Sequence, residues 1–590
     1  MTAESTPATL TETSPPGRVP WLTGRKADIV FAPRWWWPAL AVVTAFGIHV
    51  SVAWERLGPL FSADEVSVVG EAQVIATGST QWTLAGSGYM PGTSLLLAPA
   101  WWFSHDSFVV YRVGLALGVL LAMLTIIPLA VIACELGIKS RNGALTLAAI
   151  VMLAPARTVP SNYVISEALL VLATATLIAL AFRVTRRASP ASMAVLGAVA
   201  GTVFLAHGRG IAVTCGACVW ALIFAGTRWR LSGMFIAAAG VVVMASWTLY
   251  EWIVGELFWA DDRLGQTFNG LSSHNLAELA GTAIGLGWYT IGAWPAVGIV
   301  GLMIAIKRFR RFNGEALLLL TLAPTLVLAL IQLDKGSDIP GFTRLDAWIY
   351  GRYIDHLLTI AAVMGLAVLV RVSAWMVQSV VVVGTAVVGV AFLLITAPQI
   401  HDGAYWSHVH VAGVVYMLSE ANFLNNAPEP WVLLTFAAWA LSCAVAISAR
   451  VRAVPIILGA LWVALSISTD RGIINPHDEL KRIPQNIAAP LETLEPGAVV
   501  GFDKNFGLGI NAFAFGLQPR QVVITTTSRA ATRYPAFYTA HGISEPLDFG
   551  ALPYAGPAFY GYWLWFFPGP AFDELNANSM LAHPEATNDN

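Results

Sequence analysis

The chain has 590 residues, of which 56% are hydrophobic and only 12% charged, whereas about a quarter of the residues of a soluble globular protein are charged. The 33 basic residues nearly balance the 35 acidic ones, so there is no basic surplus for binding nucleic acid, and the four cysteines form no disulfide framework. This composition excludes a soluble enzyme and predicts an α-helical polytopic membrane protein.

The N-terminal segment, residues 1–33, is rich in Thr, Pro, Ser and Glu. It has no apolar core of the signal-peptide kind. Because such a segment can bury too little apolar surface to fold, we predict a disordered cytoplasmic tail.

Residues 34–468 hold the apolar runs that predict a transmembrane domain. A run of about 17 to 25 mostly apolar residues is long enough to cross a bilayer as a helix. Such runs lie at 35–55, 107–133, 143–159, 166–183, 191–206, 210–226, 232–254, 283–306, 315–332, 353–370, 375–397, 431–449 and 453–468. The sequence therefore predicts about thirteen transmembrane helices.

Basic residues collect in alternate loops, and short cytoplasmic loops carry the positive excess. With the N-terminus inside, the inner loops contain Lys139, Arg141, Arg183, Arg186, Arg187, Arg228, Arg230, Lys307, Arg308, Arg310, Arg311, Arg371, Arg450 and Arg452. The opposite loops contain Asp64, Glu65, Glu256, Asp261, Asp262, Asp334 and Asp338. This distribution predicts a multi-pass protein of the plasma (inner) membrane with a cytoplasmic N-terminus.

Three regions are predicted to lie outside the cell. Two loops, 56–106 and 255–282, are long, and long loops in compact proteins usually carry function. Residues 469–590 alternate turn signals with short β-rich runs such as GAVVGF and RQVVITTT, which predicts a small extracytoplasmic domain of mixed α/β type.

Ionisable residues at the mouths of membrane spans are costly, so each needs a partner or a function. Five positions on the predicted outer side qualify, and they are Asp64 with Glu65, Arg112, Glu167, Arg209 and Arg352. Carboxylates and arginines together suit sugar transfer from a lipid phosphate. A carboxylate can accept the proton of the attacking hydroxyl, and guanidinium groups can hold the departing phosphate.

Several motifs resemble the GT-C superfamily of membrane glycosyltransferases, especially its branch of aminoarabinose transferases and protein O-mannosyltransferases. They are SADEV at 62–66, GYMPGTSLLLAP at 88–99, YRVGLALGVLL at 111–121, SEALLV at 166–171 and GRYIDHLL at 351–358. The resemblance implies a cytoplasmic N-terminus, many spans and an external domain after them.

The resemblance also implies roles for single residues. Asp64 would be the catalytic base, Glu65 its neighbour in the acidic motif, and Glu167 a second acidic residue that positions the acceptor or the base. Arg352 would bind the lipid phosphate. The sequence departs from the family in one respect, because no His-Glu or His-His pair in the long external loops matches a clear metal site. We therefore name no metal and no cofactor, although a divalent cation stays open.

Further substrate-binding candidates follow from position and charge. Arg112 and Arg209 are cations at the outer ends of spans. Tyr353 follows Arg352, His207 precedes the Gly208-Arg209-Gly210 turn, and Tyr89 lies in the Tyr-Pro-Gly segment. We assign all five to the substrate side of the site.

A structural alternative stands beside each of these roles. Asp64, Glu65 and Glu167 could cap helices, because acidic residues favour a helix N-terminus. Arg112 and Arg352 could extend to the interface as amphipathic side chains do. His207 could belong to a polar turn closed by its neighbouring glycines.

The sequence thus favours a glycosyltransferase that moves a sugar from a polyprenyl-phosphate donor to an extracytoplasmic glycan, lipid or protein, with inversion. The alternative from another class is a polytopic transporter or lipid flippase. The runs of spans show no internal repeat, and the ionisable residues sit on one side of the membrane, whereas transporter sites lie near the midplane. Neither the sugar nor the acceptor follows from the sequence.

Overall fold

The computed structural model describes residues 33–60, 62–80, 82–86, 88–259, 275–331, 344–371, 375–400, 406–418, 428–449, 453–474, 491–495, 497–504, 510–517, 520–525, 529–540, 545–555 and 562–582. The predicted tail up to residue 32, most of the second long loop, and the acidic residues Asp261, Asp262, Asp334 and Asp338 lie outside these ranges.

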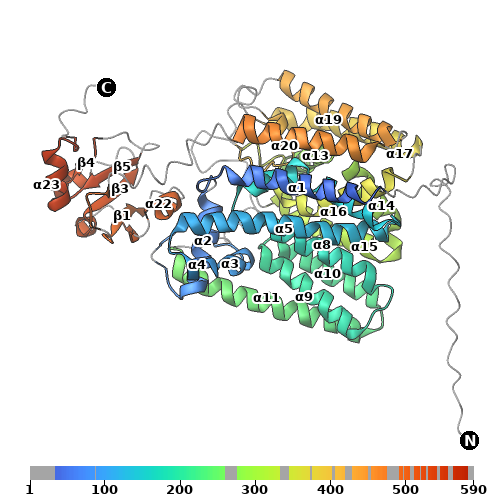
Figure 1. Cartoon of the computed structure of the whole chain (residues 1–590), viewed down its shortest axis with the longest axis horizontal. Helices are drawn as coiled ribbons and strands as arrows, with labels where there is room; N and C mark the ends of the chain where they lie inside the picture. The colour runs from blue at the N-terminus through green and yellow to red at the C-terminus, as the bar shows by residue number, and fades with distance from the viewer. Residues whose placement is uncertain are drawn as a thin grey trace, which may run out of the picture.

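A bundle of apolar helices forms most of the molecule (Figure 1). Its helices are α1 (Trp36–Trp54), α5 (Ser107–Glu135), α6 (Arg141–Val151), α7 (Pro155–Thr158), α8 (Glu167–Val184), α9 (Pro190–Ala206), α10 (Gly210–Ala225), α11 (Trp229–Leu257), α13 (Leu276–Ala293), α14 (Val297–Arg308), α15 (Gly314–Ile331), α16 (Asp355–Leu369), α17 (Trp375–Ala391), α19 (Pro428–Ser448) and α20 (Val454–Thr469). Each predicted apolar run therefore coincides with one helix or with a bent pair of helices.

The described residues include eight helices long and apolar enough to cross a membrane, or ten if each of two bent pairs counts as one crossing. Three shorter apolar helices, α9, α10 and α16, complete the bundle. The polytopic helical fold is confirmed, whereas thirteen crossings remain a prediction.

Local sequence explains where the helices begin and bend. The Asp106 side chain accepts a hydrogen bond from the N–H of Phe108 and so caps α5, as short polar residues do at N-caps. Pro155 opens α7, where the chain turns by 78° after α6. A proline cannot continue the preceding helix but suits the first turn of the next one. This bend leads the chain from α6 to the start of α8.

The first long loop is folded. It contains α2 (Ser62–Thr77), α3 (Gly92–Leu97) and α4 (Ala100–Phe103), which lie together against one end of the bundle (Figure 1). Trp101 is buried and its indole N–H donates to the carbonyl of Val69 on α2. This packing fixes α2, which begins with the acidic motif.

The C-terminal part forms a five-stranded mixed sheet in the order β2-β1-β3-β5-β4. The strands are β1 (Val500–Asp503), β2 (Val522–Thr525), β3 (Ala536–Ala540), β4 (Leu552–Pro553) and β5 (Tyr562–Phe566), with helices α22 (Ile510–Gly516) and α23 (Pro570–Ala577). Strand β1 pairs in parallel with β2 and β3, and β5 is antiparallel to its neighbours β3 and β4. The predicted mixed α/β character is therefore present.

The sheet lies at the α2 end of the bundle (Figure 1), and the two parts share one hydrophobic core. Phe515 of α22 contacts the rings of Trp82, Phe108 and Tyr111, with centroids 6.3, 4.8 and 5.8 Å away. Offset aromatic contacts of this kind add to the apolar area that they bury. Helix α22 is thus the element that joins the C-terminal part to the first loop and α5.

Candidate functional site

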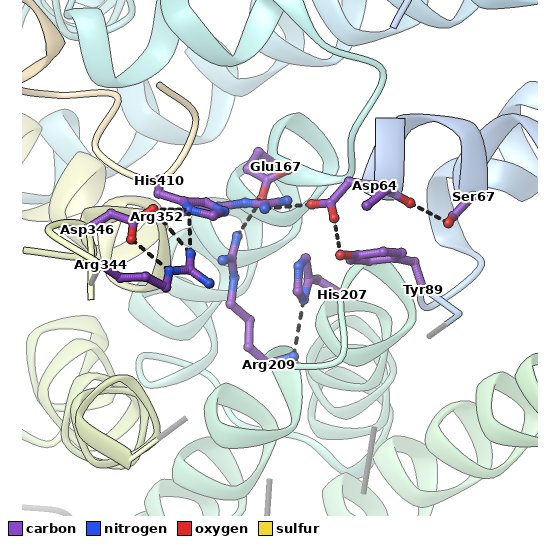
Figure 2. A network of polar contacts seen from close by, with 11 residues as sticks. Asp64, Ser67, Tyr89, Glu167, His207, Arg209, Arg344, Asp346, Arg352 and His410 are labelled. Atoms are coloured by element: carbon purple, nitrogen blue, oxygen red, sulfur yellow. Dashed lines mark hydrogen bonds and ion pairs between the residues drawn. The ribbon is translucent and has the colours of Figure 1, made fainter. Parts of the chain in front are cut away.

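Four segments that are distant in sequence meet in one buried polar network (Figure 2). They are the first turn of α2 with Asp64, the start of α8 with Glu167, the turn before α10 with Arg209, and the 3-10 turn η4 (Gly351–Tyr353) with Arg352. All four side chains are at least nine-tenths buried. Charges buried this deeply persist only when paired or hydrogen-bonded, and each of them is.

Arg352 is the centre of the network. Its Nη1 donates to Oδ2 of Asp64 at 2.6 Å, and its Nε donates to Oε1 of Glu167. Burial alone would lower the pKa of Arg352, but Glu167 and Asp64 together raise it well above its ordinary value. The guanidinium therefore stays charged and holds the two carboxylates in one place.

Arg209 contributes the second cation. Its Nη2 donates to the same Oε1 of Glu167 at 2.8 Å, and its guanidinium carbon lies 5.3 Å from the ring centroid of Tyr353. The turn that presents Arg209 is tight, because a side chain at Gly210 would overlap the backbone carbonyl of Val203. Glycine thus permits α9 and α10 to close around this turn.

Tyr89 and His207 complete the side of the network nearest α2 (Figure 2). The Tyr89 hydroxyl donates to Oδ1 of Asp64, and its ring meets His207 edge to face, with centroids 6.0 Å apart. Nδ1 of His207 accepts from the backbone N–H of Arg209 at 3.2 Å. Both oxygens of Asp64 are therefore hydrogen-bonded, one to a phenol and one to a guanidinium.

Three polar atoms of this network have no hydrogen-bond partner among the described residues, although all are buried. They are Oε2 of Glu167, Nε of Arg209 and Nη2 of Arg352. A buried polar atom without a partner costs about 1–3 kcal/mol, and such atoms are uncommon in folded proteins. Two of the three are donors on adjacent guanidinium groups, which is the arrangement that an oxyanion with several oxygens can bind.

A second cluster, made of Arg344, Asp346 and His410, holds the backbone of Arg352. The backbone N–H of Arg352 donates to the carbonyl of His410 at 3.1 Å, and Nδ1 of that histidine lies 2.5 Å from Oδ2 of Asp346. Arg344 donates to both oxygens of Asp346, at 3.0 and 3.2 Å. Burial would raise the pKa of Asp346, but His410 and Arg344 outweigh it and lower the pKa to about 2. The carboxylate stays ionised and fixes the segment that carries Arg352.

The network contains seven of the nine residues that the sequence nominated. Asp64, Glu167, Tyr89, His207, Arg209, Arg352 and Tyr353 lie together. Asp64 and Glu167 also occupy the first turns of α2 and α8. The same two residues therefore satisfy both readings, a place at a helix N-terminus and a place in the shared network. Arg112 does not join them, because it is an exposed residue of α5.

Glu65 points to a different place from Asp64, since successive residues of a helix face directions about 100° apart. Its Oε1 accepts from the Tyr111 hydroxyl at 2.7 Å and from the N–H of Val164 at 2.9 Å. Its Oε2 accepts from the N–H of Leu60 at 2.8 Å. The carboxylate thus ties α2 to α5 and to the segment before α8, which indicates a structural role for this residue.

We expect Glu65→Gln to destabilise the fold by about 1–3 kcal/mol. Glutamine keeps one acceptor oxygen but places an NH₂ group against a backbone N–H that needs an acceptor. Thermal unfolding in detergent measures the loss, with the exposed Glu574→Gln on α23 as control. Loss of transfer with unchanged unfolding would instead support the role in the acidic motif that the resemblance implies.

Sequence reasoning missed several charged residues of this region. Arg157 is buried, lies 4.0 Å from Asp355 and lines a cavity between α5 and α8. A lone arginine in the apolar run MLAPARTVP was a detectable signal. Glu71, on the buried face of α2, accepts from the N–H of Tyr89 and the hydroxyl of Ser94, both at 2.7 Å. Its partners lie 18 and 23 residues away, so no short motif revealed it.

Within the described part of the chain, no three His, Cys, Asp or Glu side chains gather to form a metal site. The two carboxylates that would be nearest to such a role, Asp64 and Glu167, are bridged by Arg352.

Two solved structures of ArnT share this fold, and an oligosaccharyltransferase matches with a lower TM-score. ArnT from Cupriavidus metallidurans bound to undecaprenyl phosphate matches with a TM-score of 0.54 and 15% identity, over 90% of this chain and 98% of that one. Its apo state matches with a TM-score of 0.52 and 14% identity, over 90% and 97%. The archaeal oligosaccharyltransferase AglB from Archaeoglobus fulgidus, in complex with an inhibitory peptide and a dolichol-phosphate, gives 0.41 and 12%, over 90% and 74%.

No protein-family model matches the chain, and no curated protein matches its sequence. At 14–15% identity the likeness to ArnT shows the fold. The chain therefore shares the fold of ArnT, a member of the GT-C superfamily that its motifs resemble.

Proposed function

We propose that this protein is a membrane glycosyltransferase that moves a sugar from a polyprenyl-phosphate donor to an acceptor on the outer side of the membrane. Asp64 is the base, and Arg352 with Arg209 binds the phosphate of the donor. The structure that matches over nearly its whole length, ArnT from Cupriavidus metallidurans, was solved with undecaprenyl phosphate bound, which supports a lipid phosphate as the donor class.

The observation that carries the proposal is the contact between Arg352 and Asp64 at 2.6 Å, beside unpaired donors on Arg352 and Arg209. A base and a phosphate-binding cation must lie within a few ångströms of each other, because the attacking oxygen and the leaving oxygen both contact one sugar carbon. The Arg352 guanidinium can reach both, because Nη1 holds Asp64 and Nη2 is available for a phosphate oxygen.

The reaction then proceeds as a single displacement. The acceptor hydroxyl gives its proton to Asp64 as its oxygen forms a bond to the anomeric carbon. The bond from that carbon to the phosphate oxygen breaks, and the electron pair leaves with the polyprenyl phosphate. Arg352 and Arg209 stabilise the charge that develops on the leaving phosphate. Attack opposite the leaving group inverts the configuration of the sugar.

Glu167 keeps the two cations in position. Its Oε1 accepts from both Arg209 and Arg352, so their charges are held side by side although they repel. Its second oxygen has no hydrogen-bond partner among the described residues, and in this mechanism it accepts a hydrogen bond from a hydroxyl of the sugar or of the acceptor. Glu167 thus positions substrate and cations but need not take the proton.

The test is transfer from a panel of radiolabelled polyprenyl-phosphate sugars by membranes that contain the protein, with crude cell-envelope material as acceptor. We expect one donor to be consumed, with equal release of polyprenyl phosphate and of labelled product. Movement of the labelled donor between the leaflets of sealed vesicles, without release of polyprenyl phosphate, would overturn the proposal in favour of the flippase alternative.

A further inference from the structure

The loop that carries Tyr89 is held by the C-terminal part of the chain. Ala85 lies between α2 and Tyr89, and both of its backbone groups bind one side chain of α22. The N–H of Ala85 donates to Oδ1 of Asn511 at 2.9 Å, and Nδ2 of Asn511 donates to the carbonyl of Ala85 at 3.0 Å. We call this pair of bonds the Asn511 clamp.

The preceding residue, Leu84, is held by two backbone hydrogen bonds to residues at and just after the end of α11. The N–H of Leu84 donates to the carbonyl of Leu257 at 2.9 Å, and the N–H of Trp259 donates to the carbonyl of Leu84 at 3.1 Å. Four backbone groups of two successive residues are therefore satisfied by the end of α11 and by α22. A loop with its polar groups fixed in this way has little freedom to shift.

Asparagine is the side chain that fits this task. Its amide presents one acceptor and one donor side by side, as a backbone strand edge does. Asn511 is fully buried, and asparagine is mostly exposed in folded proteins. The burial is therefore explained by the clamp, because the two bonds replace the hydration that the amide loses.

The clamp is connected to the catalytic carboxylate by a short path. Four residues after Ala85, the N–H of Tyr89 donates to Glu71 at 2.7 Å, and the Tyr89 hydroxyl donates to Oδ1 of Asp64. A second path runs from Phe515 of α22, whose ring packs on Tyr111. Helix α22 thus contacts Tyr111, which binds Glu65, and holds Ala85 in the segment that leads to Tyr89, which binds Asp64.

We propose that Asn511 is a positioning residue for Tyr89 and Asp64. The C-terminal part of the chain then helps to hold the loop that carries Tyr89 in its catalytic position. The effect on turnover rests on the proposed function, whereas the effect on loop position does not. Asn511 contacts neither Arg352 nor Arg209 through any hydrogen bond in the described part of the chain. Loss of the Asn511 side chain should therefore change the rate of the chemical step and leave donor binding intact.

The experiment uses the full-length protein in detergent with Asn511→Ala, and the exposed Asn576→Ala on α23 as matched control. We expect kcat to fall about 10- to 100-fold, as displacement of catalytic groups by about 1 Å can cause, with the KM for the donor within about 2-fold because its binding energy is unaltered. Unchanged kcat, or an equal rise in the donor KM, overturns the inference.

Hydrogen–deuterium exchange of the peptide that covers residues 82–90 tests the clamp without turnover. Loss of one hydrogen bond worth about 0.5–1.5 kcal/mol should speed exchange of the Ala85 amide about 2- to 10-fold in Asn511→Ala. Wild-type exchange in that variant overturns the clamp. If the wild type transfers no sugar from any donor, the proposed function fails while this result still decides the clamp.

Asn511→Asp keeps the test decisive if the alanine variant does not fold. Ionised aspartate has no donor for the Ala85 carbonyl, whereas the protonated acid supplies both bonds. Its kcat relative to that of the wild type should therefore rise as the pH falls from 8 to about 5, toward the usual carboxyl pKa of about 4. A ratio that does not change with pH overturns the inference.

Discussion

Asp64→Asn is expected to lower sugar transfer by about 10²- to 10⁴-fold, the usual contribution of a general base. The amide has nearly the volume of the carboxylate, and its oxygen can still accept the hydrogen bond from Arg352. The change removes basicity and leaves the shape of the site almost unaltered. Transfer of a radiolabelled sugar from the donor found in the panel measures the loss, and binding of that donor should remain.

The matched control is Asp573→Asn, an exposed aspartate on α23, which should transfer at the wild-type rate. Folding of the Asp64 variant is checked by its melting temperature in detergent. Because Arg352 keeps its second carboxylate, Glu167, we expect the fold to persist. Full turnover by Asp64→Asn would show that Asp64 is not the base and would leave it a structural partner of Arg352 and Tyr89.

Arg352→Lys should lower kcat/KM about 10- to 100-fold, because each charge-assisted hydrogen bond that is lost is worth about 1.5–3 kcal/mol. Lysine keeps the charge but cannot hold Asp64, Glu167 and a phosphate oxygen in fixed directions, as the planar guanidinium does. The loss should appear both in the KM for the donor, because Arg352 binds its phosphate, and in kcat, because Arg352 also stabilises the charge that develops on the leaving phosphate. Steady-state kinetics with the donor as the varied substrate measures both constants.

The same substitution at Arg112 is the control, since Arg112 is exposed on α5. We expect Arg112→Lys to have wild-type kinetics, and equal losses at both arginines would contradict the assignment of the phosphate site. The double variant with Asp64→Asn should lose less than the product of the single losses. Residues in direct contact are rarely additive, and these two share a hydrogen bond.

Much of the membrane fold could be predicted because hydrophobic length and the positions of basic residues are local properties of the sequence. The helix positions followed from the apolar runs, and the mixed α/β character of the C-terminal part followed from short β-rich runs between turn signals. The bends in two apolar runs were not foreseen. Pro155 was visible in the sequence, but the angle of a bend depends on the helices packed around it.

The site could be predicted only where charge stood out against an apolar background. Glu167, Arg209 and Arg352 were found in this way, and they do share one network. Their pairing was not predictable, since Asp64 and Arg352 are 288 residues apart. Neither was the difference between Asp64 and Glu65, which depends on the direction in which each side chain leaves α2.

The docking of α22 could not be predicted either. Asn511 lies in an unremarkable stretch, INAFAFG, and its partner Ala85 is 426 residues earlier in the chain. Its partner groups are backbone atoms, which leave no signature in the sequence. Side chains that bind backbone are therefore the class of positioning residue that single-sequence reasoning misses.

The wide spacing of the network also sets the order in which its charges can become paired while the chain is synthesised. Asp64 and Glu167 are inserted early, and Arg209 emerges 42 residues after Glu167 and can neutralise it at once. Asp64 waits for Arg352, which is inserted far later. A chain that ends before Arg352 holds Asp64 without this counter-ion, so the network that the proposed function requires is complete only after residue 352 has been synthesised.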